Sequence, residues 1–138
     1  MIVVDTSVIL AFMNSADTWH EEVCAWMDSE DGPLATTPLI LAEADHLVGA
    51  RGGSAAQEAL RLDLASGAYA VEWWRGALNT TLEIAHHYKD GMIGLADASL
   101  IALAGHIDTL AIATLDERHF RAARSLHGDA FRLLPADH

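Results

Sequence analysis

Four acidic residues lie among apolar neighbours. Asp5 follows the apolar run 1–4, Glu43 lies within TPLILAEADHLV, Asp97 interrupts MIGLADASLIALA and Asp116 follows LAIATL. A carboxylate in such surroundings is costly unless a donor or a cation pairs with it, and clustered carboxylates also repel one another. A cluster of all four would therefore require a cation. Since the donors are oxygens and no Cys/His set has ligand spacing, we expect Mg²⁺ or Mn²⁺ and metal-assisted phosphodiester hydrolysis.

Three of these acids have a second interpretation. Asp5, Asp97 and Asp116 each precede a stretch with a helical pattern, and aspartate is a favoured N-cap residue. Taken singly, the sequence leaves the helix cap and the metal ligand open for each of them.

Glu43 lies in mid-helix and cannot be a cap. It follows Leu39 and precedes Leu47 at helical spacing, so it is expected to share the apolar stripe of its helix and to point inward. Asp45 competes for that position, because Leu41 and Val48 lie at the same spacing from it. Periodicity alone leaves the choice between Glu43 and Asp45 open.

Strands and helices alternate along the predicted elements that hold these acids. The expected strands are 1–4, 33–36, 68–73, 110–114 and 131–134. The expected helices are 7–14, 19–29, 38–49, 54–66, 75–89, 98–105 and 117–125. This alternation predicts an α/β fold with a central, mostly parallel sheet of about four to five short strands flanked by helices. Sites in such folds lie outside the carboxyl ends of strands, which is where Asp5 and Asp116 fall.

Local signals predict several helix boundaries. Thr18 and Thr37 are expected to cap the helices that follow them, and Pro38 fits a first helical position. The run Arg51-Gly52-Gly53 is expected to separate helix 38–49 from helix 54–66.

Composition limits the class of protein. The chain has 138 residues, 51% of them hydrophobic, which predicts a single domain over 1–138 with a real core. Cys24 is the one cysteine, so no internal disulfide is possible and a reducing compartment is expected. No apolar stretch reaches the roughly 20 residues of a membrane span, and no basic region precedes the first apolar run as in a secretory signal. We therefore expect a cytoplasmic protein with no membrane association.

The charge balance restricts the partners. Eight basic and 20 acidic residues give a net charge of −12. Taken alone, this charge argues against a general nucleic-acid binder, because it repels phosphate backbones. It suits a protein that binds cations or a basic partner.

The four acid-bearing segments together resemble one family. VVDTSVILAF is similar to the opening strand and first acid of PIN-domain ribonucleases, specifically the VapC-type toxins of bacterial toxin–antitoxin pairs. TPLILAEADHL resembles the helix with that family's glutamate, GLADASLIALA its third-acid motif and IATLDERHF its fourth. Each motif alone is weak, but four in order at family spacing, over nearly the whole chain, are a strong signal.

This resemblance implies a site. The catalytic and metal-binding residues would be Asp5, Glu43 rather than Asp45, Asp97 and Asp116. The hydroxyls of Thr6, Ser7 and Thr114 would lie nearby. One ion or two would polarise the scissile phosphate and activate a water, with Asp97 or Asp116 orienting or deprotonating that water.

The resemblance also implies an activity and partners. The chain would be a Mg²⁺- or Mn²⁺-dependent endoribonuclease that cuts structured RNA such as tRNA or rRNA loops. It would form a homodimer, and an antitoxin would inhibit it by laying an extended or helical tail over the site. An antitoxin with basic residues would suit the acidic charge of this chain.

Basic and histidine side chains have weaker interpretations. Arg118, Arg121 and Arg124 recur every third residue after Asp116, and the sequence leaves RNA phosphate contacts and a solvated face with local ion pairs equally open. The eight histidines include the pair His86-His87 and His119, and most of the eight are expected to be surface residues.

Three competing functions come from other classes. A degenerate PIN fold that only binds RNA or protein is the main alternative, and the four intact acids argue against it. A phosphotransfer enzyme with Asp5 as nucleophile is disfavoured, because D-T-S lacks a second aspartate two residues on. Metal-free RNA cleavage by histidines has no supporting spacing.

Overall fold

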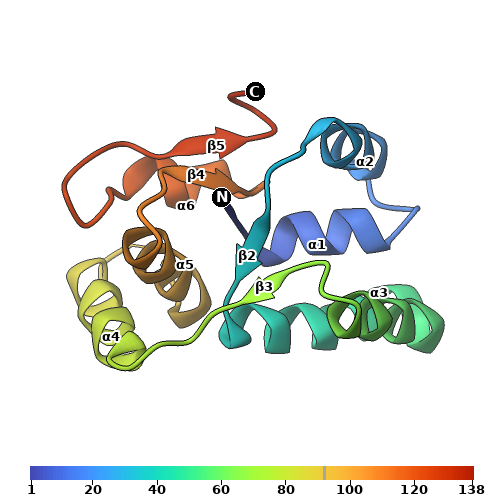
Figure 1. Cartoon of the computed structure of the whole chain (residues 1–138), viewed down its shortest axis with the longest axis horizontal. Helices are drawn as coiled ribbons and strands as arrows, with labels where there is room; N and C mark the ends of the chain where they lie inside the picture. The colour runs from blue at the N-terminus through green and yellow to red at the C-terminus, as the bar shows by residue number, and fades with distance from the viewer. Residues whose placement is uncertain (92) are drawn as a thin grey trace.

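The elements alternate along the chain as predicted. The computed structural model describes residues 1–91 and 93–138. The strands are β1 (Ile2–Val4), β2 (Leu34–Thr36), β3 (Ala70–Val71), β4 (Ala111–Ala113) and β5 (Arg132–Leu134). The helices are α1 (Thr6–Met13), α2 (His20–Ser29), α3 (Pro38–Ala65), α4 (Ala77–His87), α5 (Leu95–His106) and α6 (Glu117–Ala122) (Figure 1).

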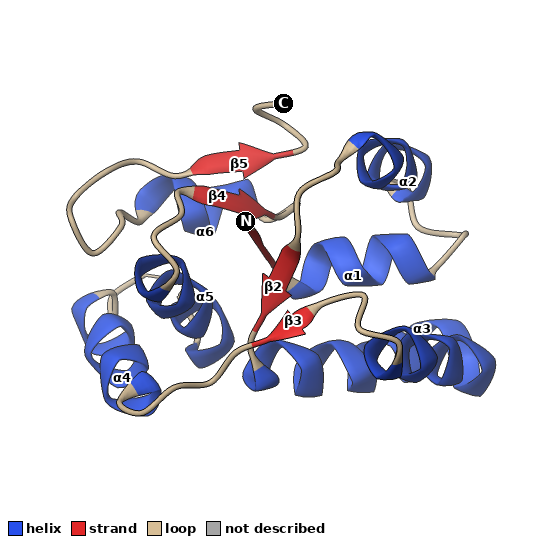
Figure 2. Ribbon diagram, viewed as in Figure 1, coloured by secondary structure: helices blue, strands red, loops and turns tan. Residues whose placement is uncertain are grey.

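The strands form one sheet in the order β3-β2-β1-β4-β5. Every strand pair in the described residues is parallel, and Val3 in the central strand is in register with Ala35 on one side and Ile112 on the other. Helices α1, α2 and α3 cover one side of the sheet and α4, α5 and α6 the other (Figure 2). The predicted α/β fold with a parallel sheet is confirmed.

The apolar pattern of the sequence explains this burial. Residues 2–4 of β1 are all apolar and buried, as expected for a strand covered on both faces. Helix α5 has a continuous buried run from Ala98 to Ala104, because it lies between the sheet and α4 and also contacts α3. None of the helices in the described residues is long and apolar enough to cross a bilayer.

The strand order creates a switch point beside the central strand. The chain leaves β1 for β2 and β3, then crosses back to β4 on the other side of β1. Parallel sheets bind ligands outside the carboxyl ends of the strands at such a point. Asp5 follows β1 and Asp116 closely follows β4, and the Asp5 amide donates to the Ala113 carbonyl at 2.9 Å, so this edge holds both residues.

One predicted helix cap is confirmed and one is wrong. Thr37 caps α3 through its hydroxyl, which accepts a hydrogen bond from the Ile40 amide at 3.3 Å. Thr18 does not cap α2, because the N-cap position is Trp19, which has no capping side-chain bond. Asp17 instead accepts from the Trp19 amide at 2.8 Å, a local turn that moves the start of the helix one residue along the chain.

Helix α3 is broken at Gly53, as the glycine pair predicted. Gly53 has φ +84° and ψ 177°, a conformation that is essentially confined to glycine. The second half of the helix returns along the first, and Arg61 binds both carboxylate oxygens of Asp45 at 2.8 and 2.9 Å. Gly49 permits this approach, because a Cβ there would lie 2.6 Å from the Gln57 amide nitrogen.

Candidate functional site

A cavity of about 300 Å³ lies at the switch point. All four predicted acids line it, and they come from four places in the fold: the ends of β1 and β4, the first half of α3 and the first turn of α5. The full lining is Asp5, Thr6, Ser7, Leu10, Glu43, Leu47, Gly94, Leu95, Ala96, Asp97, Asp116 and His119.

Asp5 is the buried acid of the cavity, only 3% exposed. Its Oδ1 accepts from the Thr6 amide at 2.8 Å, and its Oδ2 accepts from the hydroxyls of Ser7 at 2.9 Å and Thr114 at 2.8 Å. Asp5 is also the N-cap of α1, so the two interpretations of this residue are not exclusive. The Thr6 hydroxyl differs from the other two, because it is buried without a hydrogen-bond partner and only the Thr6 backbone holds Asp5.

Burial raises the pKa of the Asp5 carboxyl. The bonds from Thr114, Ser7 and Thr6 lower this pKa, but they do not outweigh the desolvation, and the nearby charge of Asp116 raises it further. The charged form of Asp5 is therefore disfavoured at this buried position, and a bound cation would stabilise it.

The same two hydroxyls tie the end of β4 to the start of α1. The Ser7 hydroxyl accepts from the Leu115 amide and the Thr114 hydroxyl from the Asp116 amide, both at 2.9 Å. Each hydroxyl thus donates to Asp5 while it accepts from the segment that carries Asp116. The separation between these two acids is fixed by hydrogen bonds as well as by the sheet.

Asp97 lies inside the first turn of α5 and is not its cap. The helix begins at Leu95, three residues earlier than predicted, and its N-cap is Gly94. The Asp97 carboxylate instead contacts His119, with Oδ2 3.0 Å from Nδ1. Burial first, and then the charge of Asp5, raise the Asp97 pKa to about 6, although His119 opposes the shift.

Asp116 occupies the N-cap position of α6 but makes no capping side-chain bond. Its Oδ2 lies 2.9 Å from the same Nδ1 of His119. The structure thus excludes the cap interpretation for Asp97 and gives no capping bond for Asp116.

Glu43 and Asp45 have separate environments, because side chains two positions apart on an α-helix point about 200° apart around its axis. Glu43 lines the cavity, whereas Asp45 binds Arg61 and Gln57 on the second half of α3. The prediction that Glu43 points inward is correct in direction and wrong in burial. Its side chain is exposed, because the cavity opens to solvent where α3 passes it.

The donors fit a hard divalent cation by their chemistry. Among the described residues, no three Asp, Glu, His or Cys side chains stand close enough to coordinate one ion as they are. Four carboxylates nevertheless converge on one cavity, and burial first, then a neighbouring acid, raises the pKa of both Asp5 and Asp97 there. A bound cation would favour the charged form of both. The roles of these acids as ligands and catalysts stay predictions.

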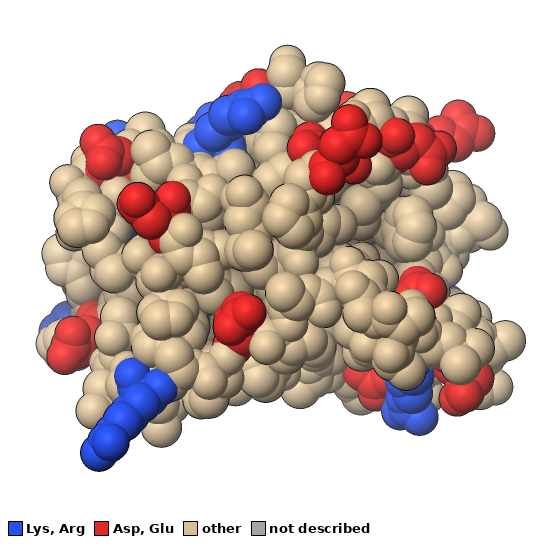
Figure 3. All heavy atoms as spheres, viewed as in Figure 1, with Lys and Arg blue, Asp and Glu red and all other residues tan. Residues whose placement is uncertain are grey.

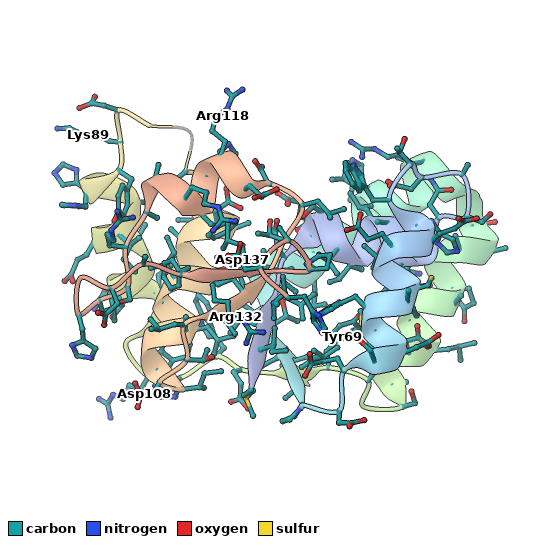
Figure 4. The ribbon with its side chains drawn as sticks, turned by 90° about the horizontal axis from the view of Figure 1, so that it is seen from above. Tyr69, Lys89, Asp108, Arg118, Arg132 and Asp137 are labelled. Atoms are coloured by element: carbon teal, nitrogen blue, oxygen red, sulfur yellow. The ribbon has the colours of Figure 1, made fainter. Side chains whose placement is uncertain are left out.

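The three predicted arginines do not share one environment. Arg121 binds Asp137 through both guanidinium nitrogens at 2.7 Å and Glu117 at 3.0 Å. Arg124 donates to backbone carbonyls at the end of α6, at 2.9 and 3.1 Å. Arg118 projects outward from α6 (Figure 4). The contacts of Arg121 and Arg124 favour local pairing, and the role of Arg118 as an RNA phosphate contact stays a prediction.

His119 is the site residue that the sequence interpretation missed. Its side chain is 16% exposed and faces two of the acids, so it differs from the surface position expected for most of the histidines. The available signal was its position three residues after Asp116, which places both on one face of a helix.

Comparison with known proteins extends over nearly the whole chain. Residues 2–125 match the family model of the PIN domain. Ribonuclease VapC26 of Mycobacterium tuberculosis (strain ATCC 25618 / H37Rv) is 36% identical over 135 residues, covering 97% of this chain and 100% of the relative.

Two solved structures share the fold. VapC20 of Mycobacterium tuberculosis, described as a sarcin-ricin loop cleaving toxin, superposes with a TM-score of 0.79 at 21% identity, covering 85% of this chain and 91% of that one. VapBC2 of Rickettsia felis, solved bound to a DNA fragment from its promoter, gives a TM-score of 0.65 at 16% identity, covering 96% and 97%.

Proposed function

Because the chain belongs to the PIN domain family, we propose that it is a divalent-metal-dependent endoribonuclease and the toxin of a toxin–antitoxin pair. The observation that carries this proposal is the convergence of Asp5, Glu43, Asp97 and Asp116 on one cavity at the switch point. A relative of matching length that bears the name ribonuclease supports the same activity. The nuclease domain would span residues 1–138.

Asp5, Asp97 and Asp116 would hold Mg²⁺ or Mn²⁺, with Glu43 at the solvent side of the cavity. The ion would supply Lewis-acid chemistry, polarising the scissile phosphate and acidifying a water. Asp5 would serve as a metal ligand and not as the general base, because three hydrogen-bond donors already fix its carboxylate. Asp97 or Asp116 would take the proton of the attacking water.

The substrate would be structured RNA, such as a loop of tRNA or rRNA. The sarcin-ricin loop cleaved by VapC20, whose fold this chain shares, is consistent with such a target. Acidic side chains gather over α2 on the face shown in Figure 3, so general attraction to RNA is weak and local contacts must position it. Arg118, which projects outward from α6, is one candidate for those contacts.

An antitoxin and a second copy of the chain complete the proposal. The net charge of −12 would favour an antitoxin with a basic segment laid over the acidic cavity. We place the homodimer and its antitoxin in the cytoplasm, where the RNA substrate is.

RNA cleavage in the presence and absence of Mn²⁺ tests this function. Purified protein should cut structured RNA with Mn²⁺ and should lose this activity in EDTA. The products should carry 5′-phosphate and 3′-hydroxyl ends, as attack by an activated water with departure of the 3′-oxygen gives. Asp5→Asn should abolish cleavage, whereas Asp45→Asn, an acid on the same helix as Glu43 but outside the cavity, should keep it. Full activity in EDTA, or products with a 2′,3′-cyclic phosphate, would refute the mechanism. A folded protein that binds RNA and never cuts it would support the binding-module alternative.

A further inference from the structure

His119 joins two acids that come from different elements. One ring nitrogen, Nδ1, lies 3.0 Å from Oδ2 of Asp97 on α5 and 2.9 Å from Oδ2 of Asp116 before α6. We assign the ring proton of His119 to Nδ1, because a bare lone pair there would face two carboxylate oxygens and repel both. His119 therefore acts as a hydrogen-bond donor toward the cavity.

The neighbours of His119 fix where this donor points. The next residue, Phe120, is 1% exposed and anchors α6 in the core, so the rotation of this short helix is set by packing. His119 is itself only 16% exposed, against 43% for Asp116. The more exposed carboxylate, that of Asp116, is thus held by the less exposed ring of His119.

We propose that His119 is a positioning residue for the metal site. Its Nδ1–H holds one oxygen of Asp97 and one of Asp116, so that the second oxygen of each is oriented for the cation. This inference rests on the proposed metal-dependent function. Carboxylates that bind metals are commonly held by such outer hydrogen bonds, and loss of one weakens metal affinity by about 10- to 100-fold.

A different role for the same contacts would give the opposite result. If protonated His119 were a substitute cation that the metal must displace, its removal would tighten metal binding. If it were only a packing residue, its removal would change stability and leave the affinity of the intact fold unchanged.

Mn²⁺ affinity of matched variants tests the proposal. His119→Ala should weaken Mn²⁺ binding about 10- to 100-fold, measured by calorimetric titration of the metal alone, without RNA. His119→Asn should recover most of that affinity, because its amide places an N–H donor near the position of Nδ1. His86→Ala, at an exposed position on α4 away from the cavity, should bind as wild type does.

The outcomes distinguish the positioning role of His119 from the proposed metal-dependent function. Wild-type affinity in His119→Ala, tighter binding in that variant, or an Asn variant no better than Ala would each overturn the positioning role while the metal site stands. Wild-type protein that binds no Mn²⁺ would overturn the proposed function, and this inference with it. Circular dichroism confirms that each variant is folded before titration.

Discussion

Replacing Asp97 with asparagine should make the metal-free protein more stable at neutral pH. Asparagine keeps the shape and one carbonyl oxygen but cannot carry the charge that burial and Asp5 disfavour at this position. The variant should also gain less stability from Mn²⁺ than wild type and lose most RNA cleavage. A residue whose removal stabilises the fold and abolishes activity is one kept for function.

The size of the effect follows from the pKa. The Asp97 pKa rises from 3.8 to about 6, which corresponds to about 3 kcal/mol at neutral pH as an upper limit. Solvent at the open cavity screens part of this, so we expect a gain of about 1–2 kcal/mol. An unfolding entropy of about 2.1 cal/mol/K per residue over 138 residues converts that gain into a rise of about 3–7 °C in melting temperature.

The direction of the Asp97 pKa shift determines how the free energy of unfolding changes with pH. The folded pKa lies above the unfolded one, so the folded state favours the proton, and the stability from this group is lost as pH rises from about 4 through about 6. Wild type in EDTA should therefore lose stability over this window, and Asp97→Asn should lose less. Below pH 4 the two should melt together. Asp5 keeps part of the slope in the variant, because burial raises its pKa too.

Thermal melts in EDTA between pH 3.5 and pH 7, read by circular dichroism, measure this difference. Asp45→Asn is the matched control with the opposite sign, because Arg61 lowers the Asp45 pKa and the pair stabilises the fold above pH 4. An Asp97→Asn variant that melts below wild type at pH 7 would refute the claim that burial and the charge of Asp5 disfavour a carboxylate at this position.

Three further predictions concern other parts of the fold. Glu43→Gln should abolish Mn²⁺-dependent RNA cleavage with little change in melting temperature, because its side chain is exposed at the cavity; retained cleavage would remove Glu43 from the site. Arg121→Gln should lower the melting temperature at pH 7, because Arg121 lowers the Asp137 pKa to about 2 and the resulting stabilisation is lost only as pH falls from about 4 towards 2. The same variant should leave the salt dependence of RNA binding unchanged, since Arg121 is paired with Asp137 and Glu117. Gly53→Ala should lower stability by about 1–3 kcal/mol in denaturant unfolding without impairing Mn²⁺ affinity, because its backbone conformation strains any side chain; an unchanged unfolding midpoint would show that the helix break does not depend on glycine.

Elements set by local pattern could be predicted from the sequence. The apolar run 1–4 and the run ending at Thr114 both became central strands, and the residues that follow them met at one edge because parallel strands align their ends. The break near Gly53 was equally visible, since two adjacent glycines disfavour a helix.

Contacts between distant elements could not be read in this way. His119 meets Asp97 across 22 positions of sequence, and only the packing of α6 beside the start of α5 brings them together. Arg121 finds Asp137 16 positions later, after β5 has returned to the sheet. A pattern of every third residue describes one helix, but it holds no information about which partner another element will bring.

The strand order also dictates when the molecule can become active during its synthesis. Asp5 is translated among the first residues, but the Thr114 hydroxyl that holds it, and Asp116 beside it, belong to the segment after β4. A ribosome adds about 5–20 residues per second, so roughly 6–20 s separate the first acid from the last. A nascent or truncated chain that stops before β4 lacks Asp116 and the Thr114 hydroxyl that holds Asp5, so the proposed site is complete only after β4 has been synthesised.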